Sequence, residues 1–313
     1  MDGTLLRWLD EYGALFVYKY LKHTFVTYKM EKTYFLKPAM QGDCIDFYVT
    51  NLKFDKISVN FDLVAKINSC KPAKEIINTN MTFVAIDAAH QKPQRLNPML
   101  FEADEFEKVS RQSGLKYMSD DDTVFHNINH IEDMLTQLNM FKTSIPIAEY
   151  KKIFFAICYH DAIHIPGNDD NEEKSFELLR KDWSKVLDED DLATIEKYIL
   201  ATKTGVEYDV IKKTKYADLI HDLDMISFID YETMKNNDVK LKTEYSIYSP
   251  IEFYQHKLKY FKRLIKDGIF ISSQYKKYNS IAIDNIKTYM KEIEELLQNL
   301  KENEKPEEVE ERE

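Results

Sequence analysis

The stretch Ile153-Phe-Phe-Ala-Ile-Cys-Tyr-His160-Asp161 is an apolar run that ends in two side chains of the kind that bind metal ions. Its apolar composition predicts a helix buried in a protein core. Burial of an adjacent imidazole and carboxylate is costly unless another group compensates for their lost hydration. A divalent cation would compensate, so the stretch predicts a metal site inside a helical domain.

Two more histidines precede this stretch. His126 and His130 lie four residues apart in a segment, 124–134, whose pattern predicts a helix. Side chains four apart project from one helical face, so both imidazoles could address one site. For His126 alone, a packing or surface role is an equally good interpretation.

The apolar stretch 217–226 supplies further carboxylates. Asp218 and Asp222 share a helical face there, whereas Asp224 points elsewhere and is interpreted first as a cap or an outer partner. A set of nitrogen and oxygen donors without thiolate suits Mn, Fe, Co, Ni, Mg or Zn and does not choose among them.

In this order the residues resemble the HD superfamily, whose pattern is H…HD…D across a helical bundle, and most closely its predicted metal-dependent phosphohydrolases. The resemblance covers roughly 122–293 and is far more specific than an isolated His-Asp pair. It runs through His126-Asn-Ile-Asn-His130, Tyr159-His-Asp-Ala-Ile-His164, Asp170-Asn-Glu-Glu-Lys-Ser175, Asp222-Leu-Asp224 and Glu244-Tyr-Ser-Ile-Tyr248.

The resemblance implies that the metal is held by His130, His160, Asp161 and Asp222. His126 falls where phosphodiesterases with a similar His-Asn-x-x-His place a proton donor to the leaving group. His164 falls where they support a second metal or its bridging water, and Glu172 is a candidate to orient water or an outer metal. The implied chemistry is metal-assisted hydrolysis, in which the ion acidifies bound water and neutralises charge on a phosphoryl oxygen.

A small phosphorylated molecule is the substrate that this resemblance implies, and we assign Lys257 and Tyr254 to its binding. Family members often have Gly-Arg after the Glu-Tyr motif, where this chain has His256-Lys257. A compact ammonium would therefore replace a planar, bidentate phosphate clamp.

The N-terminal part has a different pattern of apolar and polar residues. Apolar residues at helical spacing predict one long helix over 5–21. Alternation of apolar and polar residues then predicts strands around 26–30, 45–50, 59–65 and 81–86. A helix followed by an antiparallel sheet indicates an α+β unit and not an alternating βαβ fold.

This part is similar to acyl-CoA thioesterases of the hotdog fold, in which an antiparallel sheet wraps a long helix. The similarity covers residues 1–97 and predicts an acyl-CoA substrate and a homo-oligomer that forms through the hotdog domain. It rests on Leu5-Leu-Arg-Trp-Leu-Asp-Glu-Tyr-Gly-Ala14, Pro38 with Gly42-Asp43, Lys56-Ile-Ser-Val59, Thr82-Phe-Val-Ala-Ile-Asp87 and Lys92-Pro93.

Asp10 falls at the position of the helix carboxylate that activates water against the thioester, and we assign Ser58 to substrate binding. A carboxylate near a helix N-terminus is also favoured without catalysis. Family members carry a strand and an Asn-containing loop ahead of this helix, which supply a sheet edge and a catalytic amide. The sequence starts at Met1-Asp-Gly3 instead, so either translation begins upstream or the thioesterase is impaired.

The charge and composition of the chain limit the kinds of partner that it is expected to bind. A net charge of -11 gives no overall attraction for nucleic acid or an anionic membrane. No apolar run approaches the ~20 residues that span a bilayer. The 3 cysteines are widely spaced and suggest neither disulfides nor a thiolate zinc site, so a cytoplasmic location is expected.

The sequence thus predicts an α+β protein: a hotdog domain over 1–97, lacking its first strand, a linker over 98–121, an all-α HD domain over 122–300 and a disordered acidic tail over 301–313. The leading functional hypothesis is a metal-dependent phosphohydrolase. One alternative is a thioesterase that the HD domain regulates. Another is a non-enzymatic module that senses a nucleotide and dimerises.

Overall fold

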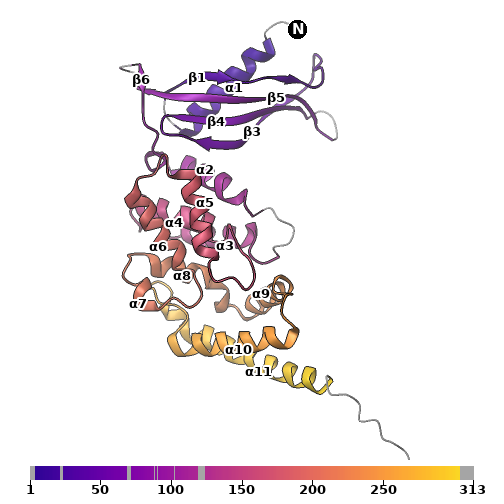
Figure 1. Cartoon of the computed structure of the whole chain (residues 1–313), viewed down its shortest axis with the longest axis vertical. Helices are drawn as coiled ribbons and strands as arrows, with labels where there is room; N and C mark the ends of the chain where they lie inside the picture. Colours follow the sequence, from indigo (N-terminus) through magenta and orange to yellow (C-terminus); the bar gives the residue numbers. More distant parts are fainter. Residues whose placement is uncertain are drawn as a thin grey trace, which may run out of the picture. The chain divides into compact units, whose positions relative to one another are not determined.

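The computed structural model describes residues 4–21, 24–68, 72–87, 89, 91–101, 103–118 and 124–303 (Figure 1). The chain divides into two compact units. The first unit comprises Met1–Gly114, Ile147–Lys151 and Glu177–Ala193, and the second comprises Leu115–Pro146, Lys152–Phe176 and Thr194–Glu313. No described helix combines the length and apolar character needed to cross a membrane.

The first unit begins with the long helix α1 (Thr4–Leu21), as the apolar spacing predicts. Its buried stripe consists of Leu9, Gly13, Val17 and Leu21, which recur every four residues and so lie on one face. Figure 1 shows α1 lying along the sheet, and it contacts strands β1 and β5.

The sheet is antiparallel, with main strand order β1-β5-β4-β3 and the short strands β2 and β6 also paired to β5. Its core face carries alternating apolar residues, including Phe61 and Leu63 of β4 and Phe83 of β5. The four predicted strands are therefore confirmed. The strands are β1 (Thr24–Met30), β2 (Tyr34–Phe35), β3 (Ile45–Phe54), β4 (Ser58–Ile67), β5 (Lys74–Asp87) and β6 (Lys92–Pro93).

Helical segments complete the first unit. The region predicted as a linker contains the 3-10 turn η1 (Pro98–Leu100) and helix α2 (Ala103–Leu115). Lys151 is buried and its Nζ donates to the carbonyl oxygen of Met99 at 2.7 Å. The ring of Trp183 stacks on Phe54 with centroids 5.0 Å apart.

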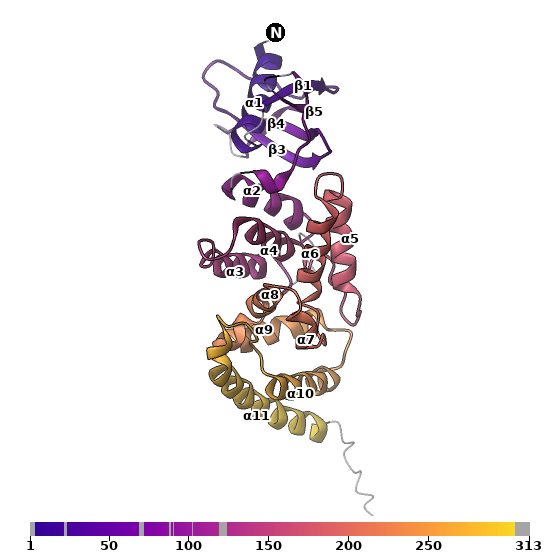
Figure 2. The same ribbon diagram turned by 90° about the vertical axis from the view of Figure 1, so that its left-hand side faces the viewer.

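Helices form all of the regular structure in the described residues of the second unit. Figure 2 shows α10 and α11 running side by side, and the two helices pack on each other. Helices α4, α5 and α6 contribute residues to both units. The helices are α3 (Ile128–Asn139), α4 (Ile147–Tyr159), α5 (Asn171–Trp183), α6 (Glu189–Leu200), α7 (Tyr208–Ile211), α8 (Ala217–Asp224), η2 (Ile226–Ile229), α9 (Tyr231–Glu244), α10 (Pro250–Asp267), η3 (Lys276–Tyr278) and α11 (Asn279–Asn303).

Two further expectations concern the start of α3 and the C-terminal tail. The helix predicted over 124–134 is wrong at its start, because α3 begins only at Ile128. The side chain of Asn127 accepts a hydrogen bond from the backbone N–H of Asn129 and so caps the helix. Of the acidic tail predicted over 301–313, residues 301–303 belong to α11, and 304–313 lie outside the described residues.

Candidate metal centre and the adjoining pocket

Three helices of the second unit bring two imidazoles and two carboxylates together. His130 lies in the first turn of α3, His160 and Asp161 directly follow α4, and Asp224 ends α8. The Nε2 atom of His130 lies 3.0 Å from Asp224 Oδ1, and that of His160 lies 2.9 Å from Asp161 Oδ2. The crossed distances, His130 to Asp161 and His160 to Asp224, are 3.7 and 3.8 Å. The four side chains therefore surround one point.

The Nε2 atoms of the two imidazoles are not satisfied by a hydrogen bond among the described residues. The Nε2 atoms of His130 and His160 are buried, and neither makes a hydrogen bond of acceptable geometry to any described residue. His160 Nδ1 lies 3.0 Å from the carbonyl oxygen of Ile157. A carbonyl can only accept, so Nδ1 carries the proton and Nε2 of the neutral ring offers its lone pair. This donor set fits a divalent cation of nitrogen and oxygen preference.

The electrostatics of the centre favour positive charge. Burial lowers the pKa of His160, but the neighbouring Asp161 and Asp224 outweigh it and raise that pKa to about 9. Burial likewise opposes ionisation of Asp161, yet the charge of His160 holds the pKa of Asp161 below its ordinary value. Protons on the imidazoles and a metal ion would therefore compete for the same place.

The position of Asp222 differs from the sequence prediction, which placed it among the ligands. Its carboxylate is fully buried and accepts hydrogen bonds from the backbone N–H groups of Ile271, at 2.9 Å, and Ser272, at 2.8 Å. Successive helical residues turn by about 100°, so residues two apart lie on opposite faces. The face that looks towards the centre is that of Asp224, and Asp222 instead anchors the segment that follows α10.

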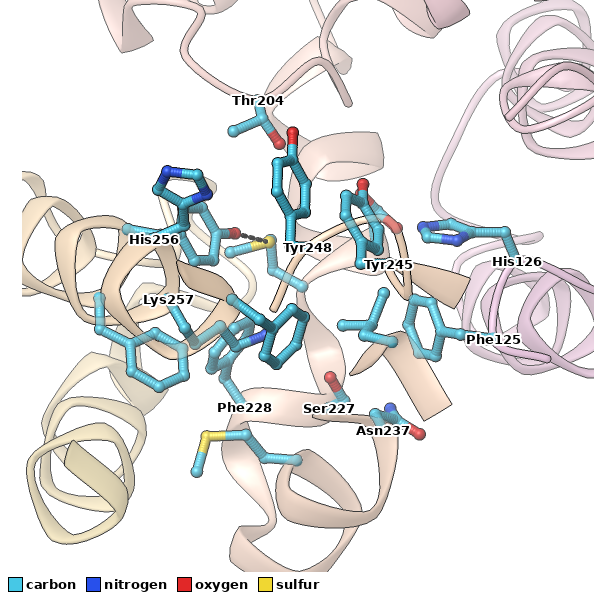
Figure 3. Close-up of a pocket in the computed structure, with 17 residues that line it drawn as sticks. Phe125, His126, Thr204, Ser227, Phe228, Asn237, Tyr245, Tyr248, His256 and Lys257 are labelled. Carbon is cyan, nitrogen blue, oxygen red and sulfur yellow. Dashed lines mark hydrogen bonds between the residues drawn. The ribbon is translucent and has the colours of Figure 1, made fainter. Parts of the chain in front are cut away.

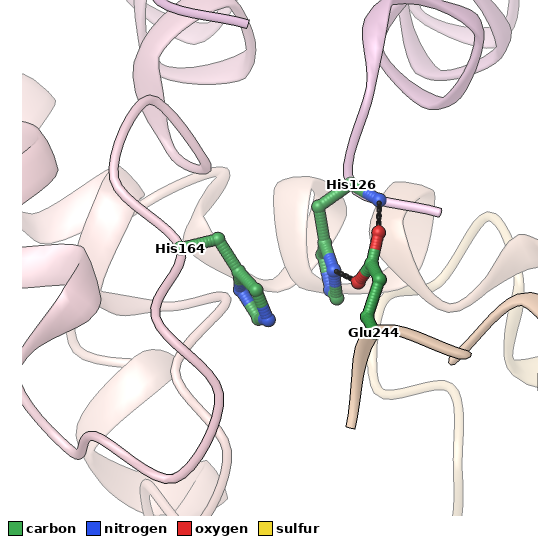
Figure 4. A group of neighbouring side chains, drawn as sticks. All are labelled: His126, His164 and Glu244. Carbon is green, nitrogen blue, oxygen red and sulfur yellow. Dashed lines mark hydrogen bonds and ion pairs between the residues drawn. The ribbon is translucent and has the colours of Figure 1, made fainter. Parts of the chain in front are cut away.

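A second group of side chains contains His126, His164 and Glu244 (Figure 4). Glu244 ends α9, and its Oε2 lies 2.6 Å from His126 Nδ1. Its other oxygen accepts hydrogen bonds from the backbone N–H groups of Phe125 and His126. The rings of His126 and His164 stack with centroids 3.5 Å apart. Glu244 thus holds both the backbone and the ring of His126.

Charge states within this second group follow from burial and contact. Burial and the adjacent His126 lower the pKa of His164 to about 4. Its Nε2 is buried without a hydrogen-bond partner among the described residues. Burial raises the pKa of Glu244, but the hydrogen bond and charge of His126, together with the backbone N–H groups of Phe125 and His126, outweigh it and leave that pKa below its ordinary value. At neutral pH, His164 is uncharged and Glu244 is an anion.

The loop between α4 and α5 is fixed by side chains of the Asp170–Ser175 motif. The Asn171 amide exchanges hydrogen bonds with the backbone of Ile165, and Ser175 Oγ does the same with Ile163. This anchoring positions His164. Glu172 is half-buried on the first turn of α5, where burial and the charge of Asp161 raise its pKa.

A pocket adjoins the two groups. Its cavity measures about 360 Å³, and Asp224 and His126 lie in its wall (Figure 3). Lys257, predicted to bind substrate, also lines it, but its Nζ lies 2.6 Å from the buried carboxylate of Asp238. Tyr254, predicted for the same role, is not among the lining residues, and its ring lies 5.0 Å from Lys242 Nζ.

The predicted residues of the first unit lie apart from the cavity found there. Asp10 is exposed on α1 and accepts a hydrogen bond of 2.7 Å from Thr27 Oγ1. Ser58 is the first residue of β4. A hollow of about 550 Å³ is lined by residues including Trp8 and Met40, but neither Asp10 nor Ser58 belongs to its lining.

Comparison with known proteins bears on the first unit. No protein-family model and no curated protein matches the sequence. A hexameric thioesterase from Yersinia pestis is similar to the N-terminal part, with 26% identity over 30% of this chain and 76% of that chain, at a TM-score of 0.28.

Two further solved structures match over a similar extent. An acyl-CoA hydrolase from Staphylococcus aureus, solved with butyryl coenzyme A, is 24% identical over 30% of this chain and 58% of that chain, with a TM-score of 0.28. A hexameric hotdog-fold thioesterase of Campylobacter jejuni is 18% identical over 35% and 80%, with a TM-score of 0.29. The match thus spans little more than half the length of the Staphylococcus protein.

Proposed function

We propose that the second unit is a metal-dependent hydrolase of phosphate esters, of the kind found in the HD superfamily. The supporting observation is the convergence of two buried Nε2 atoms, neither satisfied by a hydrogen bond among the described residues, with the carboxylates of Asp161 and Asp224. Once a metal ion displaces the protons from the imidazoles, these four side chains carry two negative charges. Buried charge of this kind is costly unless a cation compensates it.

His130, His160, Asp161 and Asp224 would hold the ion in this proposal. When bound, the ion would lower the pKa of its bound water towards ~7 and neutralise charge on a phosphoryl oxygen. Mn, Mg, Zn, Fe, Co and Ni all suit the nitrogen and oxygen donors.

His126 is the proposed proton donor to the leaving alcohol. Because its Nδ1 is bound to Glu244, Nε2 is the atom that can deliver a proton. Glu244 acts through His126 and is therefore a positioning residue. The neutral His164 beside it can accept a hydrogen bond from water through Nε2, and Glu172 can orient that water.

Elemental analysis combined with a screen of phosphate esters tests this proposal. We expect a stoichiometric divalent ion in the purified protein, and phosphate release that chelation abolishes and metal restores. Asp161→Ala should lose both the ion and the activity. If that variant and the chelated protein release phosphate at the wild-type rate, the proposal is wrong.

A second candidate function is thioester hydrolysis by the first unit. It is favoured by the packing of α1 on an antiparallel sheet and by Asp10, whose exposed carboxylate is oriented by Thr27. Asp10 would activate water against an acyl-CoA. We expect turnover that Asp10→Asn abolishes and that chelators leave unchanged. A panel of acyl-CoAs of different chain lengths, none of them cleaved, would eliminate this candidate.

Self-association of the first unit accompanies the second candidate. Exposed large side chains of this unit include Tyr28 of β1 and Tyr48 of β3, and among the described strands β1 pairs with only β5 and β3 with only β4. An exposed strand edge beside apolar groups favours pairing with a second chain. Light scattering should give a mass above that of one chain, and a monomer at all concentrations would contradict this expectation.

The non-enzymatic alternative is a nucleotide sensor with a dimerisation platform, and a binding measurement distinguishes it from the two enzymes. It predicts nucleotide binding in calorimetry without turnover of any ester. Phosphate release that depends on Asp161 would exclude it.

A further inference from the structure

The pocket beside the candidate metal centre has the position of a leaving-group site. Asp224 and His126, which belong to the two catalytic groups, both form part of its wall. An ester whose phosphoryl group lies at the centre would extend its alcohol portion into this cavity of about 360 Å³. Cavities of roughly this size hold small organic ligands.

The pocket is lined largely by aromatic rings. Figure 3 shows Phe125, Phe228, Tyr245 and Tyr248 around the cavity. The planes of Tyr245 and Tyr248 are nearly parallel, at 16°, with centroids 6.3 Å apart. Ring faces and edges of this kind bind a planar aromatic group through stacking and edge contacts.

Positive charge in the pocket is already compensated. Lys257 is the only lysine or arginine among the described lining residues, and its Nζ lies 2.6 Å from Asp238 Oδ1. The Asp238 side chain is 1% exposed, and its other oxygen accepts a hydrogen bond of 2.7 Å from Tyr289. An anionic group that entered the pocket would therefore lose hydration without gaining an ion pair.

We infer that the substrate is a phosphate monoester whose alcohol carries an uncharged aromatic ring system. This inference rests on the proposed hydrolase function and adds the identity of the leaving group. Water forms a new bond to phosphorus, the bond between phosphorus and the ester oxygen breaks, and that oxygen takes a proton from His126. The proton that the attacking water gives up replaces the one lost by His126. The products are inorganic phosphate and a neutral aromatic alcohol.

Three esters of similar leaving-group acidity test the inference: benzyl, propyl and 4-carboxybenzyl phosphate. With the metal-loaded protein, we expect kcat/KM for benzyl phosphate to exceed that for propyl phosphate about tenfold, because a ring gains stacking contacts. The carboxylate of 4-carboxybenzyl phosphate should lower its kcat/KM to about that of propyl phosphate. Equal kcat/KM values for benzyl and propyl phosphate would overturn the inference, as would a higher kcat/KM for 4-carboxybenzyl phosphate than for benzyl phosphate. Either result would leave the hydrolase function intact.

A pair of tyrosine variants provides the control. Tyr248→Ala should lower kcat/KM for benzyl phosphate, mainly through KM, about tenfold more than it lowers kcat/KM for propyl phosphate. The propyl phosphate rate of the same variant also reports whether the site is still folded. Tyr231→Ala removes a ring of α9 that contacts Glu292 outside the pocket and should change neither rate. Equal losses with both esters would contradict a stacking role for Tyr248.

Binding of benzylphosphonate, which cannot be hydrolysed, separates the two proposals. Calorimetry should show binding that Tyr248→Ala weakens about tenfold. If that result holds but no ester is cleaved, the hydrolase function fails and the pocket assignment stands. If benzylphosphonate binds no better than propylphosphonate, the pocket assignment fails.

Discussion

The two aspartates at the end of α8 allow the candidate metal centre to be tested at single residues. Asp224→Asn removes a charged group beside His130, and we expect metal affinity to fall by more than about 100-fold, since loss of an outer partner alone costs roughly 10- to 100-fold. Stability of the metal-free protein should change little. Equilibrium dialysis followed by elemental analysis measures the affinity.

Asp222→Asn is the matched variant with the opposite expectation. It weakens the acceptor of two backbone N–H groups in a buried place, and hydrogen bonds to a charged group contribute about 1.5–3 kcal/mol each. We expect a loss of about 2 kcal/mol in the free energy of unfolding, with metal content unchanged in the folded protein. Metal loss confined to Asp222→Asn would reverse the assignment of the two residues.

Glu244→Gln tests the positioning of His126. The amide keeps the size of the side chain but cannot hold the His126 Nδ1 proton as a carboxylate does. We expect kcat for phosphate release to fall roughly 10- to 100-fold with KM and metal content unchanged. Glu232→Gln, an exposed acid on the same helix, is the control and should leave kcat as it is. Equal kcat values for wild type and Glu244→Gln would remove the positioning role.

Acid should destabilise the second unit through His164. Its pKa is lowered from 6.5 to about 4 in the folded protein, so between these values the unfolded chain binds more protons. Stability is therefore fully present above pH 6.5 and declines as the pH falls towards 4, by about 3 kcal/mol. Urea unfolding of the metal-free protein measures this dependence, and His164→Asn should flatten it.

At the scale of elements, α1 depends on a close approach to β5. A Cβ added at Gly13 would lie 2.9 Å from the Phe83 ring and 3.0 Å from Met81 Sδ. Both side chains are fully buried and have little room to move. Gly13→Ala gains about 1 kcal/mol of helix propensity but costs about 1–3 kcal/mol of overpacking.

We therefore expect Gly13→Ala to destabilise the first unit by about 1 kcal/mol in urea unfolding. Glu11→Ala, which removes only an exposed ion pair with Arg7, is the control and should change stability by less than about 0.5 kcal/mol. A variant more stable than wild type would show that the Phe83 ring can move aside.

Elements were predictable where one-sided burial imposes a period on the sequence. Strand β4 alternates buried and half-buried residues over much of its length, as its sequence does. Strand β5 begins at Lys74, earlier than predicted. The prediction missed its first half because the segment around Asn78 and Asn80 has low strand propensity. Asn80 donates to Asp62 on the neighbouring strand at 2.7 Å, and this tertiary pairing extends the strand.

At the scale of the whole molecule, metal removal should act on one unit alone. A ligand that binds only the native state stabilises it by about 4 kcal/mol at 1,000 times its Kd. Calorimetric unfolding with and without a chelator should therefore lower the transition of the second unit and leave that of the first unchanged. If neither transition moves, the native protein binds no ion. If both move, the two units unfold together.

Sequence patterns were enough to predict the local features: the long first helix, the four main strands and the His160-Asp161 pair at the end of a buried helix. These follow from the spacing of apolar residues along a short segment, which reflects burial on one face.

Tertiary packing, which the sequence does not reveal, placed Asp224 and not Asp222 against His130 and His160 and bound Lys257 to Asp238. It also joined Glu244 to His126, 118 residues earlier in the chain. Such pairings depend on how separate helices pack and end, and no periodicity within one segment carries that information.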